Sequence, residues 1–595
     1  MAIQTLCELF YGSVDGFQKP ERLRHKRDGA WRTVSSDELR AAVEEIALGL
    51  ASLGLDKGDH VAILSENRPE WAFADMAVLA LGGADVPIYP SLPAAQVRYI
   101  LADSEAKAVF VSSATQAAKV AEVRDGLEGL QHVIAFEPVA GAISLDELRT
   151  RGREDLAKDK DALRTRAARV AASDLATIIY TSGTTGDPKG VMLTHGNLVS
   201  NTLGAAKAFP QLQPDWTCLS FLPLCHVFER TAGHNLMLHA GATIAYAESV
   251  ERVADNMVEV RPQIMSSVPR LYEKMYGRVH EKVAKDPKWR QAVFRWALSV
   301  GRAGFQARVA RRRPGPLLRL KLALAARLVF SKIKERTGGR LEIFISGGAP
   351  LAREIAEFFG AADILICEGY GLTETSPVIT CNRPDRLRPG SVGLPIEGVE
   401  VKIAEDGEIL TRGPHVMQGY YKKPEATREA IDSEGFFHTG DIGHLDPEGF
   451  LVITDRKKDL IATSGGKKIA PQPIENRLKA NRFFSEVVMI GNRRNFAAAL
   501  VVPNFELLAG WAKERGIDGT REELVKKPEV VAYYLELVRE LTADLAQFEK
   551  IKKVALLPKD FSQAAGELTP TYKVKRRVVE ERYKELIDDL YRGAA

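Results

Sequence analysis

The chain has 595 residues, which at roughly 100–200 residues per domain excludes a single small module. Hydrophobic residues make up 45% and charged residues 27%, a globular balance that argues against wholesale disorder. The five cysteines are scattered and lack metal-binding spacing, which favours a reducing compartment over a disulfide framework. The first residues show no secretory signal, and no apolar run reaches the roughly 18 residues of a membrane span, so we expect a cytoplasmic protein.

Charge is distributed unevenly along the chain. The formal net charge is only +4, from 82 Lys and Arg against 78 Asp and Glu. Residues 278–340 alone contain 18 basic and three acidic side chains, a net charge of +15, which leaves −11 for the rest. We therefore expect an acidic body that bears one concentrated basic element.

The first half of the chain alternates strand-like and helix-like segments. Residues 60–66 predict a buried strand and residues 71–84 a helix. Further strands are expected at 106–113, 132–136, 176–182, 243–248 and 341–348. This β/α alternation predicts an α/β fold in which helices cover mostly parallel sheets.

The pattern of predicted elements changes at about residue 390. Short strands expected at 399–404 and 407–413 are separated by Gly, Pro and Asp turns, which indicates a small β-rich subdomain over about 390–455. A basic, polar linker near 455–460 precedes a new run of strands and helices. We therefore predict an N-terminal domain of residues 1–455, with a basic helical insertion at 278–340, and a small α+β C-terminal domain of residues 456–595.

A loop rich in glycine and hydroxyl side chains follows the strand expected at 176–182. It contains Thr181, Ser182, Gly183, Thr184, Thr185 and Gly186, followed by Lys189. Backbone N–H groups turned inward by glycines, together with hydroxyl and lysine donors, can surround phosphate oxygens. The spacing differs from the Walker A motif, in which lysine directly follows glycine. A flexible surface turn is the alternative, but the concentration of donors after a buried strand favours a phosphate site.

Residues 177–198 resemble the signature of the AMP-forming adenylating enzymes. This family includes acyl-CoA synthetases, the adenylation domains of peptide synthetases and luciferases. Further motifs follow in the order that the family shows, from about residue 60 to 577, so the resemblance is nearly full-length. The resemblance implies a large N-terminal domain, a small C-terminal lid domain and activation of a carboxylic acid by ATP.

The resemblance assigns nucleotide contacts to three further motifs. In residues 368–377 it implies that Tyr370, followed by Gly371, stacks on adenine, that Thr373 contacts the α-phosphate and that Glu374 holds Mg²⁺. A carboxylate beside a triphosphate suits Mg²⁺, although an isolated Glu is usually a solvated surface residue. The remaining implied contacts are Gly348 and Ala349 at the adenine wall, and Asp441 and Arg456 at the ribose.

The C-terminal motifs imply a moving domain that acts in two steps. Lys458, two residues after Arg456, occupies the family's hinge position, although a solvated basic loop would look the same. Gly465 and Gly466 would border the tunnel for the CoA thioester arm. Lys573 aligns with the catalytic lysine, which neutralises charge in the transition state. The family usually has Gly before this lysine, where this chain has Tyr572, so Lys575 stays a rival assignment.

The acyl substrate is suggested by residues 222–234, which match the form found in long-chain acyl-CoA synthetases, with His226 at the acyl entrance. The basic insertion agrees, because long-chain relatives have one here. Within it, Trp289, Val293, Trp296 and Val300 share one helical face, and such a helix can lie on an anionic membrane. Packing on its own protein is the alternative. No nucleic-acid motif accompanies the charge, so we expect no nucleic-acid partner.

The sequence therefore most resembles a bacterial long-chain fatty acid–CoA ligase. This resemblance implies ATP, Mg²⁺ and coenzyme A as cofactor and co-substrates and fatty acid as substrate. The charge and amphipathic pattern of residues 278–340 add peripheral contact with the inner face of an anionic membrane as an expectation. The alternatives are a ligase for a medium-chain or aryl acid, transfer to an acyl carrier protein, or an inactive acyl-binding membrane-associated protein. A homodimer stays open.

Overall fold

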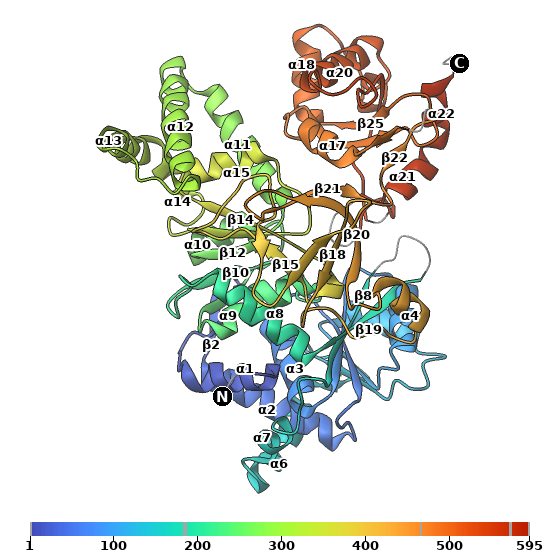
Figure 1. Cartoon of the computed structure of the whole chain (residues 1–595). Coiled ribbons are helices and arrows are strands. Elements are labelled where there is room, and N and C mark those ends of the chain that lie inside the picture. Colours follow the sequence, from blue (N-terminus) through green and yellow to red (C-terminus); the bar gives the residue numbers. More distant parts are fainter. Residues whose placement is uncertain (1–2, 182–186, 465–466, 564, 570–573, 593–595) are drawn as a thin grey trace.

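Two large sheets with parallel central strands form the body of the protein, and helices cover them (Figure 1). The computed structural model describes residues 3–181, 187–464, 467–563, 565–569 and 574–592. Within these residues the first sheet runs β16 (Leu394–Pro395), β15 (Val378–Cys381), β14 (Leu365–Gly371), β13 (Ile343–Ser346), β12 (Ile264–Ser267), β10 (Thr217–Ser220), β11 (Thr243–Tyr246), β1 (Leu23–Arg27) and β2 (Ala30–Val34). The second runs β19 (Gly419–Tyr420), β9 (Lys189–Thr194), β8 (Leu175–Thr181), β4 (Ala84–Ile88), β3 (His60–Leu64), β5 (Ala108–Val111), β6 (His132–Ala135) and β7 (Ile143–Ser144).

The helices of this body follow the strands in the order expected for β/α units. They are α1 (Leu6–Gly16), α2 (Ser36–Ser52), α3 (Pro69–Leu81), α4 (Ala94–Asp103), α5 (Ala114–Glu122), α6 (Leu145–Lys158), α7 (Ala162–Ala167), α8 (His195–Ala208), η1 (Glu229–Asn235), α9 (Leu236–His239), α10 (Val253–Val260), α15 (Arg353–Ala361), η3 (Thr373–Thr375) and α16 (Pro424–Ala430). All residues of β4 and β5 are buried, as befits parallel strands covered on both faces.

Helix α3 lies between the two sheets and is buried along almost its whole length. Every residue but Glu70 is buried, because a helix that is apolar all round needs cover on all sides. The sequence predicts this helix over 71–84, but it begins at Pro69 and ends at Leu81. Gly82 closes it in the left-handed region, with φ of 89°, which a residue without Cβ adopts without strain.

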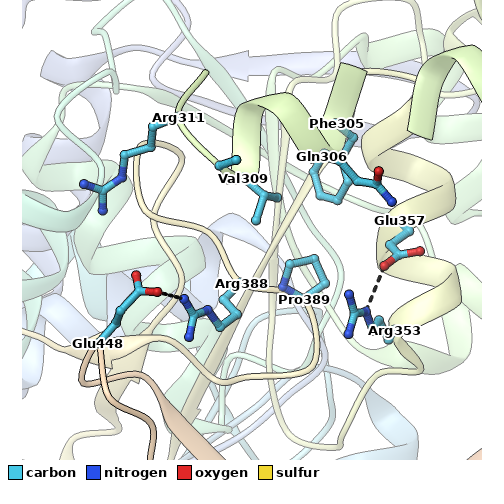
Figure 2. Close-up of a pocket in the computed structure, with 10 residues that line it drawn as sticks. Phe305, Gln306, Val309, Arg311, Arg353, Glu357, Arg388, Pro389 and Glu448 are labelled. Carbon is cyan, nitrogen blue, oxygen red and sulfur yellow. Dashed lines mark hydrogen bonds and ion pairs between the residues drawn. The ribbon is translucent and has the colours of Figure 1, made fainter. Parts of the chain in front are cut away.

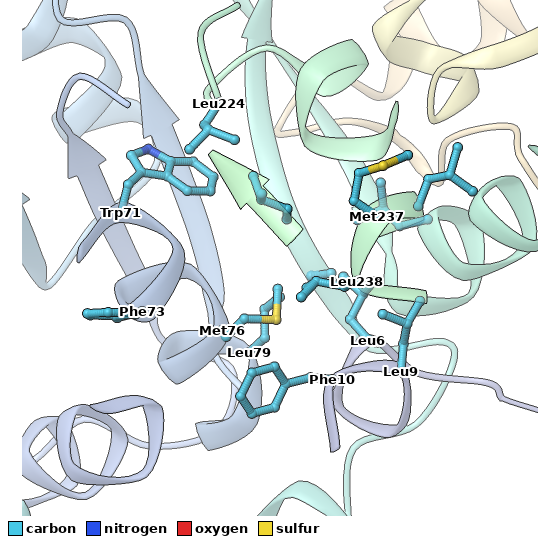
Figure 3. Close-up of a cluster of buried hydrophobic side chains, with 14 of the residues drawn as sticks. Leu6, Leu9, Phe10, Trp71, Phe73, Met76, Leu79, Leu224, Met237 and Leu238 are labelled. Atoms are coloured by element: carbon cyan, nitrogen blue, oxygen red, sulfur yellow. The ribbon is translucent and has the colours of Figure 1, made fainter. Parts of the chain in front are cut away.

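A buried ion network lies between the two sheets, within the main core. Arg230 of η1 pairs with Asp75 of α3 and lies 3.0 Å from Oδ1 of Asp85 on β4. All three side chains are fully buried. Trp71, Met76, Leu224 and Met237 belong to the surrounding apolar cluster (Figure 3). The arginine therefore compensates two carboxylates that water cannot reach.

Replacing Arg230 with methionine should destabilise the fold by about 3–5 kcal/mol, because two buried carboxylates would lose their cation. A shift of the urea-unfolding midpoint measures this loss. The matched control is Lys207→Met, which breaks the exposed pair with Glu397 and should cost less than about 1 kcal/mol. Equal midpoints for the two variants would contradict a structural role for the network.

Beyond residue 394 the chain forms smaller sheets. One comprises β17 (Glu400–Ile403), β18 (Glu408–Arg412), β20 (Phe437–Leu445) and β21 (Leu451–Arg456). β19, within the range expected for the β-rich subdomain, instead extends the second large sheet beside β9. The last part contains β22 (Ile461–Ala462), β23 (Lys468–Ile469), α17 (Pro471–Lys479), β24 (Phe484–Ile490), β25 (Ala498–Pro503), α18 (Phe505–Glu514), α19 (Arg521–Leu524), α20 (Pro528–Leu541), β26 (Lys553–Leu556), α21 (Arg576–Arg582) and α22 (Lys584–Tyr591). Its apolar residues form a core of their own, from Ile461 to Ile587.

The basic insertion is helical, as the sequence predicts. It consists of α11 (Pro269–Lys285), α12 (Lys288–Val309), α13 (Pro316–Ala325), η2 (Ala326–Phe330) and α14 (Ser331–Glu335). The apolar face expected on α12 is divided, because Trp289 is 64% exposed whereas Val300 is buried in a core shared with α15. Within the described residues, no helix combines the length and the apolar character needed to cross a bilayer.

Candidate active site

Three side chains from two sheets meet where β14 reaches its carboxyl end. The hydroxyl of Tyr370 donates to Oδ2 of Asp441 at 2.7 Å, and Nε of Arg456 lies 3.2 Å from Oδ1 of the same carboxylate. Antiparallel pairing of β20 with β21 sets Asp441 opposite Arg456. Burial and the nearby Asp441 carboxylate hold the pKa of Tyr370 well above its usual value, so the phenol remains a neutral donor. An aromatic ring, a carboxylate and a cation here suit a nucleoside with its ribose hydroxyls.

A second group of side chains surrounds the carboxylate of Glu374. The hydroxyl of Tyr420 donates to Oε1 of Glu374 at 2.8 Å, and Nζ of Lys189 lies 4.9 Å from the centre of the Tyr420 ring. Burial raises the pKa of Glu374, while hydrogen bonds and the charges of Arg456 and Lys189 oppose this shift. The charges of Arg456 and Lys189 therefore both act on the Glu374 carboxylate. This interaction links the group around Glu374 to the group formed by Tyr370, Asp441 and Arg456.

The loop expected to hold phosphate joins two antiparallel strands. Thr181, the last residue of β8, pairs with Lys189, the first residue of β9. This strand–loop–strand arrangement differs from the strand–loop–helix arrangement of the Walker A motif. Ser182, Gly183, Thr184, Thr185 and Gly186 lie outside the described residues. The described residue that follows the loop, Lys189, lies beside Tyr420, because β19 pairs with β9.

The glycine-rich turn after β13 packs against the segment that contains His226. A Cβ on Gly347 would lie 3.1 Å from the ring of Phe228, a tight contact that would push the ring by a few tenths of an ångström. Gly348 adopts a φ of 81° and precedes Ala349 on the way into α15. The half-buried ring of His226 accepts a hydrogen bond at Nδ1 from the Phe228 N–H at 3.1 Å. The contact between Gly347 and Phe228 therefore joins the turn expected to form the adenine wall to the segment expected to form the acyl entrance.

The motif around Glu374 is also shaped by close backbone packing. A Cβ on Gly371 would lie 1.7 Å from the carbonyl oxygen of Pro377, so only glycine fits there. Thr373 begins η3 directly before Glu374 and is half-buried. The backbone carbonyl of Glu374 accepts from the N–H of Met417 at 2.8 Å. These contacts fix the position of the carboxylate relative to Lys189.

The C-terminal motifs are only partly described. Gly465, Gly466 and Lys573 lie outside the described residues. Lys575, the rival of Lys573, directly precedes α21 as its N-cap residue and donates its backbone N–H to the carbonyl oxygen of Glu567 at 2.7 Å. Lys458 follows the end of β21 by two residues, between the four-stranded sheet and the C-terminal core. Its neighbour Lys457 is tied back to that sheet through Glu408, at 2.9 Å.

Sequence reasoning missed two side chains that the structure places in or near the site. Tyr420 contacts both Glu374 and Lys189, yet it reaches them through the pairing of β19 with β9, for which the sequence carries no local signal. Glu368 is buried in the middle of β14, and burial raises its pKa to about 8. Its position two residues before Tyr370, as the one charged residue of this strand, was the available signal.

A separate cavity of about 440 Å³ lies beside the end of α12 (Figure 2). Arg311, Arg353 and Arg388 line it, and two of these already pair with acids: Arg353 with Glu357 at 2.8 Å, and Arg388 with Glu448. Among the residues that the structure describes, none of the predicted nucleotide contacts lines this cavity. It is therefore distinct from the candidate nucleotide site.

Comparison with known proteins identifies the family. The profile of the AMP-binding enzyme family matches residues 16–421, and that of the AMP-binding enzyme C-terminal domain matches residues 458–595. The chain belongs to the AMP-binding enzyme family. The resemblance drawn from the sequence motifs is thereby confirmed.

Individual AMP-binding enzymes match over nearly the whole chain. Long-chain-fatty-acid–CoA ligase FadD15 of Mycobacterium tuberculosis is 37% identical over 95% of this chain and 93% of its own length. Long-chain-fatty-acid–CoA ligase 1 of Homo sapiens is 33% identical over 98% of this chain and 87% of its own. A crystal structure of the anthranilate CoA ligase AuaEII with anthranoyl-AMP is 18% identical, with a TM-score of 0.74 over 98% of both chains. The expected α/β fold of an AMP-binding enzyme is confirmed.

Proposed function

We propose that this protein activates a long-chain fatty acid with ATP to acyl-AMP and pyrophosphate, and then transfers the acyl group to coenzyme A. The observation that carries the proposal is the joined cluster of Tyr370, Asp441 and Arg456 with Glu374 and Lys189. It offers a nucleoside site next to a carboxylate and two cations. Relatives named as long-chain-fatty-acid–CoA ligases match over nearly the whole chain and supply the substrate class.

In the first step, the fatty acid carboxylate attacks the α-phosphorus of ATP and pyrophosphate leaves. Asp441 and Arg456 hold the ribose, Tyr370 stacks on adenine and Thr373 contacts the α-phosphate. Lys189 and the loop of residues 181–186 bind the β- and γ-phosphates. Lys573 stabilises the negative charge that develops at the reacting centre.

Glu374 fits the role of a Mg²⁺ ligand. A single protein carboxylate combined with substrate phosphates is a common Mg²⁺ site, and Tyr420 orients this carboxylate by a hydrogen bond. Bound Mg²⁺ would neutralise phosphate charge during the departure of pyrophosphate. Nζ of Lys189 lies 4.9 Å from the centre of the Tyr420 ring, and we assign this cation to the same phosphates.

In the second step, the CoA thiol attacks the acyl carbon of acyl-AMP, AMP leaves with the bonding electrons and the thiol proton is released. We propose that residues 456–595 rotate about Lys458 between the steps, which withdraws Lys573 and admits CoA. Gly465 and Gly466 would let the pantetheine arm pass. His226 lies at the acyl entrance, fixed by the Phe228 backbone.

ATP–pyrophosphate exchange with a series of carboxylic acids tests the substrate class. We expect exchange to be fastest with long-chain fatty acids and weak with aryl acids. Preference for a medium-chain or aryl acid would overturn the chain-length part of the proposal. Absence of exchange with every acid would favour an inactive acyl-binding protein.

Replacing Asp441 with asparagine should raise the KM for ATP by roughly 10- to 100-fold, because the ribose and Arg456 would lose a charged partner worth about 1.5–3 kcal/mol. The KM in ATP–pyrophosphate exchange measures the effect. Tyr370→Phe is the matched control, since it removes the hydroxyl that binds Asp441 but retains the ring. An unchanged KM for the Asp441 variant would exclude a ribose contact.

Two statements about partners stay predictions from the sequence. Peripheral contact of residues 278–340 with an anionic membrane would bring the enzyme to the phase in which long-chain fatty acids accumulate. A homodimer stays open, and sedimentation of the purified chain would decide it.

A further inference from the structure

One face of α13 and η2 exposes a row of leucines to solvent. Leu317, Leu320, Leu324 and Leu328 are 64%, 69%, 49% and 46% exposed. Their spacing of three or four residues places them on the same side of the helix. Scattered apolar side chains are normal on protein surfaces, whereas a contiguous row on one helix marks a contact surface. We name these four residues the leucine face.

The opposite side of the same helix is held by the protein. Leu322 approaches Gly304 of α12 so closely that a Cβ there would lie 2.7 Å from the leucine side chain. Ala325 and Phe330 are buried in the core that α12 and α15 share. The helix therefore has two apolar sides, and packing uses only one of them. In Figure 1, α13 lies at the outer edge of the molecule, in agreement with the exposed fractions of the four leucines.

Basic side chains surround the leucine face. The stretch 311–334 contains eight Lys and Arg and no Asp or Glu. Arg311, Arg312 and Arg313 precede the helix, and Arg319, Lys321 and Arg327 lie on it; all six are exposed. Among the residues that the structure describes, none of these six forms an ion pair with an acidic side chain. Their charge is therefore available to an external partner.

We propose that the leucine face is a docking surface for an anionic lipid bilayer. Leucines flanked by cations match the membrane interface, where apolar side chains enter the acyl region and cations meet lipid phosphates. A second copy of this chain fits poorly, because a two-fold contact would bring two such basic helices together. The exposed leucines and the surrounding cations are sufficient to support membrane docking. The role of docking in the entry of fatty acid from the bilayer rests on the proposed function.

Co-sedimentation with phosphatidylcholine vesicles, with and without phosphatidylglycerol, tests the proposal. The test variant replaces all four leucines with glutamine, which keeps helix propensity. A second variant replaces Arg319, Lys321 and Arg327 with glutamine. The matched control is Val258→Gln, which removes an apolar side chain of similar exposure, 49%, outside the insertion. Circular dichroism and ATP–pyrophosphate exchange with detergent-dispersed fatty acid verify that each variant is folded and active.

We expect the unchanged protein and the Val258 control to bind vesicles that contain phosphatidylglycerol. The leucine variant should bind these vesicles at least about tenfold more weakly than the unchanged protein. The charge variant should lose the preference for anionic lipid. Equal binding by the leucine variant would overturn the proposal, as would failure of the unchanged protein to bind. Self-association that the leucine variant abolishes would instead assign the surface to a second copy. Loss of exchange activity in all proteins would contradict the proposed function but not the docking.

Discussion

Replacing Lys573 with alanine should slow acyl-AMP formation by about 10²–10³-fold, while thioester formation from supplied acyl-AMP and CoA continues. Removal of one group that stabilises transition-state charge typically has an effect of this size. The second step tolerates the change because the proposed rotation about Lys458 carries Lys573 away before CoA attacks. ATP–pyrophosphate exchange measures the first step, and acyl-CoA release from synthetic acyl-AMP measures the second.

Lys575→Ala is the matched control for this prediction. Lys575 directly precedes α21, and its described bond to Glu567 comes from the backbone, which alanine retains. We therefore expect this variant to keep most of its exchange activity. The reverse pattern, with Lys575 essential and Lys573 dispensable, would reassign the catalytic lysine. Equal loss of both steps in a folded Lys573 variant would contradict the division of labour between them.

Replacing Glu374 with glutamine should lower kcat/KM for Mg·ATP by about 10²–10³-fold and increase the Mg²⁺ concentration needed for half-maximal exchange. The amide keeps the shape of the side chain but removes the charge that we assign to Mg²⁺. It also leaves Lys189 and Arg456 without the carboxylate on which both act. Titration of the exchange rate with MgCl₂ at fixed ATP measures the shift.

The variant Tyr420→Phe distinguishes the effect of orienting the Glu374 carboxylate from the effect of its charge. The variant loses only the hydrogen bond to Glu374, which should lower the rate about tenfold and change the Mg²⁺ requirement less. The ring beside Lys189 remains. If Glu374→Gln left the Mg²⁺ requirement unchanged, Glu374 would be excluded as the metal ligand. An effect of Tyr420→Phe as large as that of Glu374→Gln would make the hydroxyl a direct participant.

The local motifs were sufficient to predict side chains for a nucleotide site but not to show which of them meet. Tyr370, Asp441 and Arg456 each belong to a motif that sequence reasoning recognised. In the structure, strand pairing sets Asp441 opposite Arg456, and the Tyr370 hydroxyl reaches the same carboxylate from another sheet. Tyr420 escaped because it reaches Glu374 only through the pairing of β19 with β9, which joins segments far apart in the chain. Short strands at a sheet edge carry too few residues for a periodic signal.

The basic insertion shows the same limit at the level of a helix. Periodicity located an apolar face on α12 from Trp289 to Val300, yet much of that helix packs against α13 and α15. The exposed apolar residues lie instead on α13, at Leu317 and Leu320. Both helices have apolar residues on one or more sides, and only tertiary packing decides which side is covered. The sequence alone therefore indicated the basic insertion and its charge, but it did not indicate which helix face is exposed.

The product formed with free CoA tests the central proposal most directly. Purified protein is incubated with Mg·ATP, a long-chain saturated fatty acid and CoA, and acyl-AMP, AMP and acyl-CoA are quantified over time. We predict acyl-CoA and AMP in equal amounts, with little acyl-AMP remaining while CoA is present. Accumulation of acyl-AMP without any thioester would contradict the account and identify a ligase that uses another acceptor.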